Sequence, residues 1–65
     1  MIEVQFDSHE FVIPIDNIEH LERADEGYEI YYYLHLANFE SPLEVSEADY
    51  YRIKKILIER SNNVK

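Results

Sequence analysis

Hydrophobic and polar residues alternate at the start of the chain with the period of two that is typical of a half-buried strand. Residues 2–6 follow this pattern, residues 7–10 begin with side chains that favour a turn, and residues 11–15 resume the apolar run. The three segments together predict a β-hairpin. Because proline has no N–H to donate to a neighbouring strand, Pro14 should lie at a sheet edge or at a bulge.

The strongest strand pattern lies in the middle of the chain, over residues 28–37. It follows a turn at residues 24–27, which contains the only glycine, the residue that most easily takes a positive φ. Before this turn, the spacing of Ile18 and Leu21 leaves residues 18–23 open to either a helical turn or a bent strand. Alternation divides the long strand into a row expected in the core and an opposite row: Tyr28, Ile30, Tyr32, Leu34 and Leu36 against Glu29, Tyr31, Tyr33, His35 and Ala37.

A short strand and a helix are expected in the last third of the sequence. Residues 43–45 form the strand, and Ser46 can cap a helix that begins at Glu47 and runs to about residue 60. Residues 61–65 are expected to form a frayed tail.

These elements predict a single α+β domain over residues 1–60. A small antiparallel sheet of about four strands, namely a hairpin, a long central strand and a short fourth strand, is covered on one face by the C-terminal helix. The order of elements is common among short bacterial and bacteriophage proteins, but no motif is specific enough to name a family. The expected core includes Val4, Phe6, Ile13, Ile15, Ile30, Tyr32, Leu34, Ile53, Ile56 and Leu57.

The predicted helix is apolar on more than the single stripe that a surface helix needs. The side expected against the sheet carries Tyr50, Ile53, Ile56 and Leu57. A different side carries Tyr51, Lys54, Lys55 and Ile58. Either Tyr51 keeps its hydroxyl in water and Ile58 lies at the edge of the fold, or this side is a second contact surface.

The length of the chain limits what this fold can do alone. The chain has 65 residues, of which 46% are hydrophobic, and it contains no cysteine. A domain of this size buries too little apolar surface to be more than marginally stable, and no disulfide can stabilise it further. Oligomerisation is one way to add buried area.

Charge is distributed unevenly along the chain. Residues 1–51 hold thirteen acidic residues and one basic residue, a net −12, whereas residues 52–65 have a net +4, so the whole chain carries −8. Either the acids form a solvated surface and the bases complement a helix C-terminus, or the uneven field steers a partner. The candidate basic patch consists of Arg52, Lys54, Lys55 and Arg60.

Residues with the chemistry needed for catalysis or metal binding are few. With one glycine in the chain, no glycine-rich loop can hold a phosphate, and there is no cysteine nucleophile. The three histidines lack a recognised metal-ligand spacing, and Asp16 with His20 on one helical face would give only two ligands. We therefore expect no enzyme activity, no metal and no cofactor.

The N-terminus has no basic region followed by an apolar run, so the sequence predicts no secretory signal. The longest nearly apolar stretch, residues 30–36, is far shorter than a membrane span. We expect a cytoplasmic protein with no membrane association.

Three functions are compatible with these observations. The first is a small acidic protein-binding module of inhibitor, antitoxin, immunity or phage-regulatory type, which uses Tyr31, Tyr33 and His35 to anchor a basic partner. The second is a structural homo-oligomer that uses this aromatic row together with Tyr51 and Ile58. The third is anion or nucleic-acid binding through the basic patch, which the net charge of −8 argues against.

Overall fold

The computed structural model describes residues 1–6 and 8–63, and these form five strands, a short 3-10 helix and one α-helix. In chain order the elements are β1 (Ile2–Phe6), β2 (His9–Ile13), η1 (Ile15–Asn17), β3 (Ile18–Asp25), β4 (Ile30–Leu36), β5 (Leu43–Val45) and α1 (Glu47–Asn63). The predicted turn residue Asp7, the core position of the Phe6 side chain and the tail residues 64–65 lie outside what is described.

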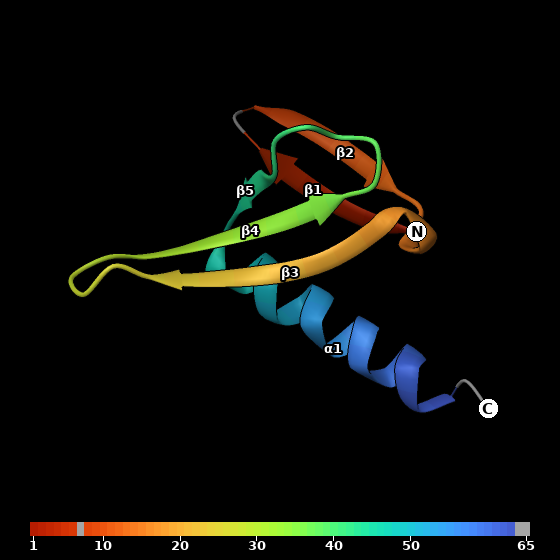
Figure 1. Ribbon diagram of the computed structural model, residues 1–65. Coiled ribbons are helices and arrows are strands. Elements are labelled where there is room, and N and C mark those ends of the chain that lie inside the picture. The colour runs from red at the N-terminus through yellow and green to blue at the C-terminus, as the bar shows by residue number, and fades with distance from the viewer. Residues whose placement is uncertain (7, 64–65) are drawn as a thin grey trace.

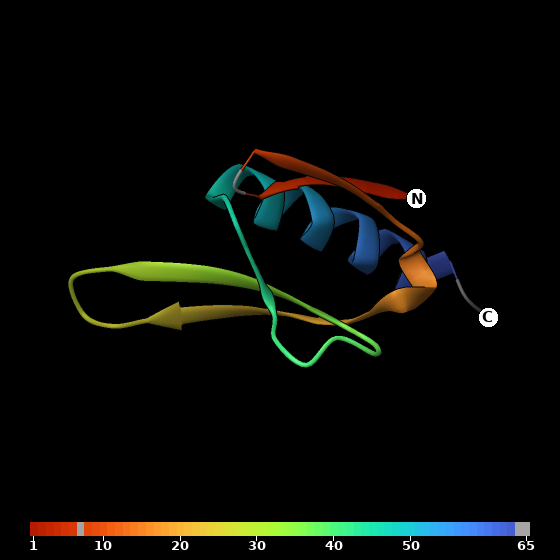
Figure 2. The ribbon, with the colours of Figure 1, turned by 90° about the horizontal axis from the view of Figure 1, so that it is seen from above.

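The α+β class is confirmed, but the strands form two antiparallel sheets rather than one sheet of about four strands. One sheet is the hairpin β1–β2, and the other has the order β3–β4–β5. The hairpin and α1 both lie behind β3 and β4 in Figure 1, and the view from above shows them on the same side of these strands (Figure 2). The three-stranded sheet therefore has a covered inner face and an open outer face.

The core lies between the inner face, the hairpin and the helix. It consists of Ile2, Val4, Ile13, Tyr32, Leu34, Leu36, Val45, Tyr50 and Ile53. Leu34 and Ile53 are fully buried, and burying a side chain of this size stabilises a fold by about 1.5–3 kcal/mol. The other residues expected in the core, Ile15, Ile56 and Leu57, are partly buried and pack against this cluster.

Strands β3 and β4 continue past the core as a two-stranded arm, which projects to the left in Figure 1. Ile30 lies on this arm and is 42% exposed, so its predicted place in the core is wrong. The reason is that α1 begins beside the base of the arm and extends away from it (Figure 1). The arm ends in a turn in which the Glu26 N–H donates to the Glu29 carbonyl at 2.8 Å and Gly27 has a φ of +96°.

The segment that the sequence left open, residues 18–23, is part of strand β3. Ile18 pairs with Leu36 and Leu21 pairs with Leu34. Ile18 and Leu21 are three residues apart, whereas their partners on β4 are only two apart. A register shift between Ile18 and His20 supplies the extra residue, as a β-bulge does. The bulge explains why the apolar spacing resembled that of a helix.

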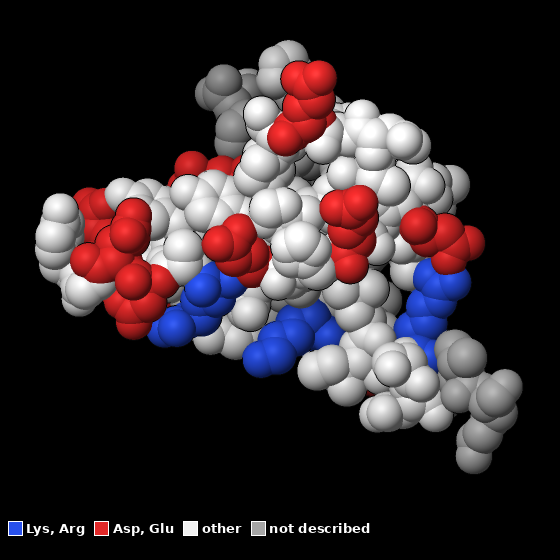
Figure 3. Space-filling view, viewed as in Figure 1, with Lys and Arg blue, Asp and Glu red and all other residues white. Residues whose placement is uncertain are grey.

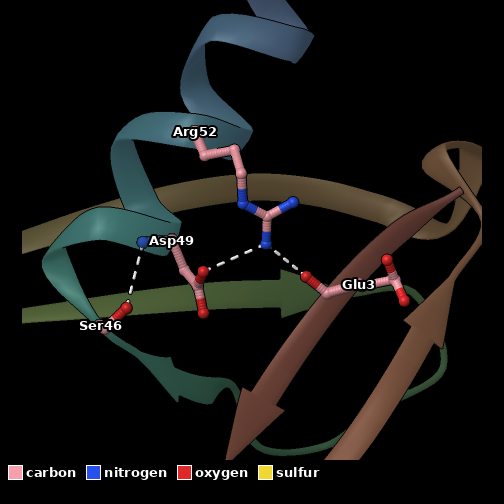
Figure 4. A network of polar contacts seen from close by, with 4 residues as sticks. All are labelled: Glu3, Ser46, Asp49 and Arg52. Atoms are coloured by element: carbon pink, nitrogen blue, oxygen red, sulfur yellow. Dashed lines mark hydrogen bonds and ion pairs between the residues drawn. The ribbon is translucent and has the colours of Figure 1, made fainter.

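The helix begins where the sequence predicts, because Ser46 caps it. The Ser46 hydroxyl accepts a hydrogen bond from the Asp49 N–H at 3.1 Å (Figure 4). Arg52, one turn later, donates to Asp49 at 3.1 Å and to the backbone carbonyl of Glu3, which ties the helix to β1. The helix continues to Asn63, three residues beyond the predicted end.

Candidate functional site

The outer face of the three-stranded sheet gathers rings and carboxylates from all three strands. Cross-strand pairing places His20 beside His35, Glu22 beside Tyr33 and Ala24 beside Tyr31, and it places Glu44 on the other side of Tyr33. Side chains of paired residues point to the same face, so these residues form one surface. We call this surface the outer face: His20, Glu22, Ala24, Tyr31, Tyr33, His35 and Glu44.

One end of the outer face is organised by a pair of stacked histidines. The rings of His20 and His35 lie 4.1 Å apart and are nearly parallel, with an interplanar angle of 16°. His35 Nε2 donates to the Glu22 carboxylate at 2.7 Å, which fixes the orientation of its ring. The helical face proposed for Asp16 and His20 is therefore wrong, because His20 belongs to a strand.

The other end of the outer face carries two stacked tyrosines. The rings of Tyr31 and Tyr33 lie 6.4 Å apart at an interplanar angle of 21°, and both side chains are half-buried. The Tyr31 hydroxyl donates to the Glu29 carboxylate. This hydrogen bond raises the pKa of Tyr31 above its ordinary value, and burial together with the negative charge of Glu26 acts in the same direction.

Carboxylates surround these rings, and no Lys or Arg belongs to the outer face as defined. Glu22 and Glu44 flank Tyr33 on either side, and Glu29 holds the hydroxyl of Tyr31. Figure 3 views this side of the molecule and shows acidic side chains spread across it, with the basic ones along the lower edge, where α1 lies. The surface thus combines flat aromatic anchors with a negative field, and both attract cationic groups.

His20, Glu22 and Glu44 are functional candidates that sequence reasoning missed. The available signal was the alternation of β3, which puts His20, Glu22 and Ala24 in one row if residues 18–25 are a strand. The unresolved choice between helix and strand concealed that row.

Tyr51 and Ile58, which the sequence grouped with the aromatic row, lie on another side of the molecule. The Tyr51 ring lies edge to face against Tyr32, an inner-face residue, with the ring centres 6.2 Å apart. Tyr51 and Ile58 are about half exposed, and Lys54 Nζ lies 5.7 Å from the centre of the Tyr51 ring. Residues three, four and seven positions apart share one side of a helix. We call this side of α1 the helix stripe: Tyr51, Lys54, Lys55 and Ile58.

The four residues of the candidate basic patch do not form one surface. Arg52 is bound by Asp49 and by the carbonyl of Glu3, and Arg60 is bound by Asp16 of η1. Lys54 and Lys55 belong to the helix stripe instead. A patch that loses two of its four charges to neighbouring oxygen atoms has less charge left to neutralise phosphates.

Two hollows lie away from the outer face. A polar hollow of about 280 Å³ separates the hairpin from the start of the helix and is lined by Glu3, Gln5, Glu10, Asp49 and Arg52. A smaller apolar hollow of about 160 Å³ is lined by Phe11, Val12, Ile13, Pro14, Asn17, Leu36, Ala37 and Phe39. Within residues 1–6 and 8–63, no group of three or more His, Cys, Asp or Glu side chains is arranged to hold a metal ion.

Comparison of the chain with protein family models, with curated proteins and with solved structures gives no match. In the described part of the chain, no helix has the length and the apolar character needed to cross a membrane. The function assigned to the outer face therefore rests on its own geometry and charge.

Proposed function

We propose that this chain is a small acidic, non-enzymatic protein-binding module that binds a basic protein partner through its outer face. The observation that carries the proposal is the stacked pair Tyr31 and Tyr33, held in place among the carboxylates of Glu22, Glu29 and Glu44. Rigid, half-buried aromatic rings lose little conformational entropy on binding, which makes tyrosine a frequent anchor at interfaces.

The carboxylates and the rings have different roles in this proposal. The acidic field attracts a basic partner and raises the rate of encounter, whereas the buried contacts on the tyrosines set the lifetime of the complex. His35 and Glu22 hold the adjoining end of the surface rigid through their hydrogen bond. The partner therefore needs Lys or Arg side chains around an exposed apolar or aromatic group.

The size of the molecule is sufficient for such an interface. A stable protein complex of ordinary size buries roughly 800 Å² on each partner. The accessible surface of this chain is 4978 Å². An interface of that size takes up about a sixth of this surface, so binding to a basic surface requires no second domain. Inhibitor, antitoxin, immunity and phage-regulatory proteins are classes that act in this way.

The test is capture of basic proteins by the immobilised chain, with two double variants that differ only in the surface they change. Tyr31→Ser with Tyr33→Ser removes the anchors, and Val12→Ser with Phe39→Ser removes two side chains that are each 54% exposed elsewhere. We expect the wild type and the Val12/Phe39 variant to retain the same basic proteins from a bacterial lysate at low salt and to release them at high salt.

The Tyr31/Tyr33 variant should retain none of these proteins while keeping the circular dichroism spectrum of the wild type. A synthetic Lys/Arg-rich peptide containing a central Trp serves as a defined probe, with a Ser-substituted peptide of the same length as its control. Equal capture by all three proteins, or capture that salt does not change, contradicts the proposal.

A structural homo-oligomer is the second candidate function. It is favoured by the exposure of Tyr51 and Ile58 on the helix stripe, which no described residue covers. Single exposed apolar residues are ordinary on protein surfaces, but Tyr51 and Ile58 lie on one helix side and together form a larger apolar area.

A further inference from the structure

The helix stripe and the inner side of the arm are neighbouring surfaces that the described chain leaves uncovered. Tyr51 and Ile58 are 49% and 50% exposed on the helix. Ile30 lies on the inner face of the arm, in the same row as Tyr32, whose ring contacts Tyr51. The two surfaces meet at the Tyr32–Tyr51 contact and diverge from it, the arm in one direction and the helix in the other (Figure 1).

These two surfaces carry opposite charges. The tip of the arm holds the exposed carboxylates of Asp25 and Glu26, and Arg23 lies nearer the base of the arm, where it pairs with Tyr32. The helix stripe holds Lys54 and Lys55, both exposed. Because the arm and the helix point away from one another, the tip of the arm and the lysines of the same molecule do not come together (Figure 1).

A second copy of the chain has the complement of each surface. We propose that two copies pair about a two-fold axis near Tyr51, so that the arm of each lies along the helix stripe of the other. Ile30 of one copy then contacts Tyr51 and Ile58 of the other, and its arm carboxylates face Lys54 and Lys55. A two-fold arrangement uses both complementary contacts twice and leaves no open end.

The sequence of β3 disfavours the other simple way of pairing two copies, through sheet edges. β3 is the free edge of the three-stranded sheet and carries Glu19, Glu22, Arg23 and Asp25. Charged side chains along an edge strand oppose the addition of an identical strand. The arm-on-helix pairing leaves this edge unused.

This inference rests on the second candidate function, self-association, and does not depend on the outer face binding a basic protein. The outer face lies on the opposite side of the sheet from Ile30 and Tyr51. A dimer formed as proposed therefore presents two outer faces to partners.

The experiment is sedimentation equilibrium of the full chain over a dilution series, with two charge-reversed variants. We expect the wild type to approach twice the 7.9 kDa mass of one chain as the concentration rises. Asp25→Lys with Glu26→Lys, and separately Lys54→Glu with Lys55→Glu, should each raise the dimer dissociation constant on the order of 100-fold, since like charges then face one another.

The decisive experiment is to mix the two variants. Each is expected to be monomeric alone, but an equimolar mixture should form a heterodimer, because the reversed arm of one now complements the reversed helix of the other. Glu10→Lys with Glu40→Lys makes the same change in net charge as the arm variant at exposed positions outside both surfaces, and it should leave the dimer intact.

The inference is overturned by a wild type that stays monomeric at every concentration, by a dimer that both charge reversals leave intact, or by two monomeric variants that do not associate when mixed. Loss of the dimer in Tyr31→Ser with Tyr33→Ser would instead assign self-association to the outer face, which also overturns it. Capture of basic proteins by monomeric Lys54→Glu with Lys55→Glu would show that the outer-face function stands alone.

Discussion

The two halves of strand β4 have the same alternating pattern but opposite surroundings. In the C-terminal half, Leu34 and Leu36 are buried at 0% and 5% exposure. In the N-terminal half, Ile30 occupies the same row and is 42% exposed. Both halves pair with β3, so the difference does not arise from the sheet itself. It arises from what lies opposite, because the core half faces the helix and the hairpin whereas the arm half extends beyond them.

Tyr32 marks the boundary between the two halves. Its ring packs on Tyr50 with the centres 4.8 Å apart, and its hydroxyl donates to the Glu47 carboxylate at 3.0 Å. Glu47 is the first residue of α1, so the start of the helix sets the place where the core ends. Alternation in a strand thus shows which side can be buried, and the position of the neighbouring helix decides how much of that side is buried.

Truncation of Leu34, in the core half of β4, should cause the largest loss of stability. Leu34→Ala creates a cavity in the fully buried cluster and is expected to cost about 3–5 kcal/mol of unfolding free energy. A domain of this length has only roughly 3–10 kcal/mol in total, so the variant should be largely unfolded at 37 °C. Urea denaturation followed by circular dichroism measures the change. A cost below that of Ile30→Ala would contradict the division of β4.

Removing the cap of α1 should move the boundary itself. Ser46→Ala leaves the Asp49 N–H without its partner and is expected to cost about 1 kcal/mol in urea denaturation. Frayed first residues would also release Tyr32 from Glu47, which near-ultraviolet circular dichroism of the tyrosines would report. Ser41→Ala, at an exposed loop position, is the matched control and should change neither signal.

Alkaline pH should reduce the stability that Tyr32 contributes at this boundary. Burial, and the hydrogen bond to Glu47, raise the pKa of Tyr32 above its ordinary value of about 10. The folded state therefore favours the neutral phenol. This stabilisation is fully present below the ordinary tyrosine pKa and is lost as the pH rises through the higher pKa of the folded state.

We expect the unfolding free energy of the wild type to decline in that alkaline range and to decline less in Tyr32→Phe. Urea denaturation at pH steps from neutral to alkaline measures both slopes. Tyr28→Phe, at a side chain that is 91% exposed, should keep the wild-type slope. Equal slopes in wild type and Tyr32→Phe would show that Tyr32 is not the group responsible.

Substitution of Ile30 should have the smallest effect on stability. Ile30→Ser changes an exposed side chain of the arm and is expected to alter the unfolding free energy of the monomer by less than about 0.5 kcal/mol. It should nevertheless weaken self-association, which sedimentation equilibrium detects. A loss of stability close to that of Leu34→Ala would mean that the arm is as much part of the core as the rest of β4.

Local patterns predicted most of the elements of this fold. The period of two gave the hairpin and the long strand, and the cap at Ser46 gave the first residue of α1. Ile30 was wrongly assigned to the core because alternation within a strand does not show how much of that strand the helix covers. The division into two sheets depends on long-range packing of β1 beside β5, which no local pattern encodes.

The candidate site was predicted only in part. The row Tyr31, Tyr33 and His35 followed from alternation, and the structure places it on one open face. Its neighbours His20 and Glu22 required the register of β3, and a bulge at the start of that strand obscured the register. Pairing of charges across the fold, such as Arg60 with Asp16, cannot be read from local sequence because the two residues are 44 positions apart.

The contact between Arg52 and the Glu3 carbonyl has a consequence for synthesis of the chain. The two residues are separated by 49 positions, and the core joins Ile2 and Val4 to Tyr50 and Ile53 of the helix. Synthesis makes β1 and β2 before α1, so without α1 one side of the hairpin stays uncovered. The core can therefore be completed only after Ile53 has been made, and a chain that ends before Ser46 leaves apolar surface exposed and is prone to aggregate.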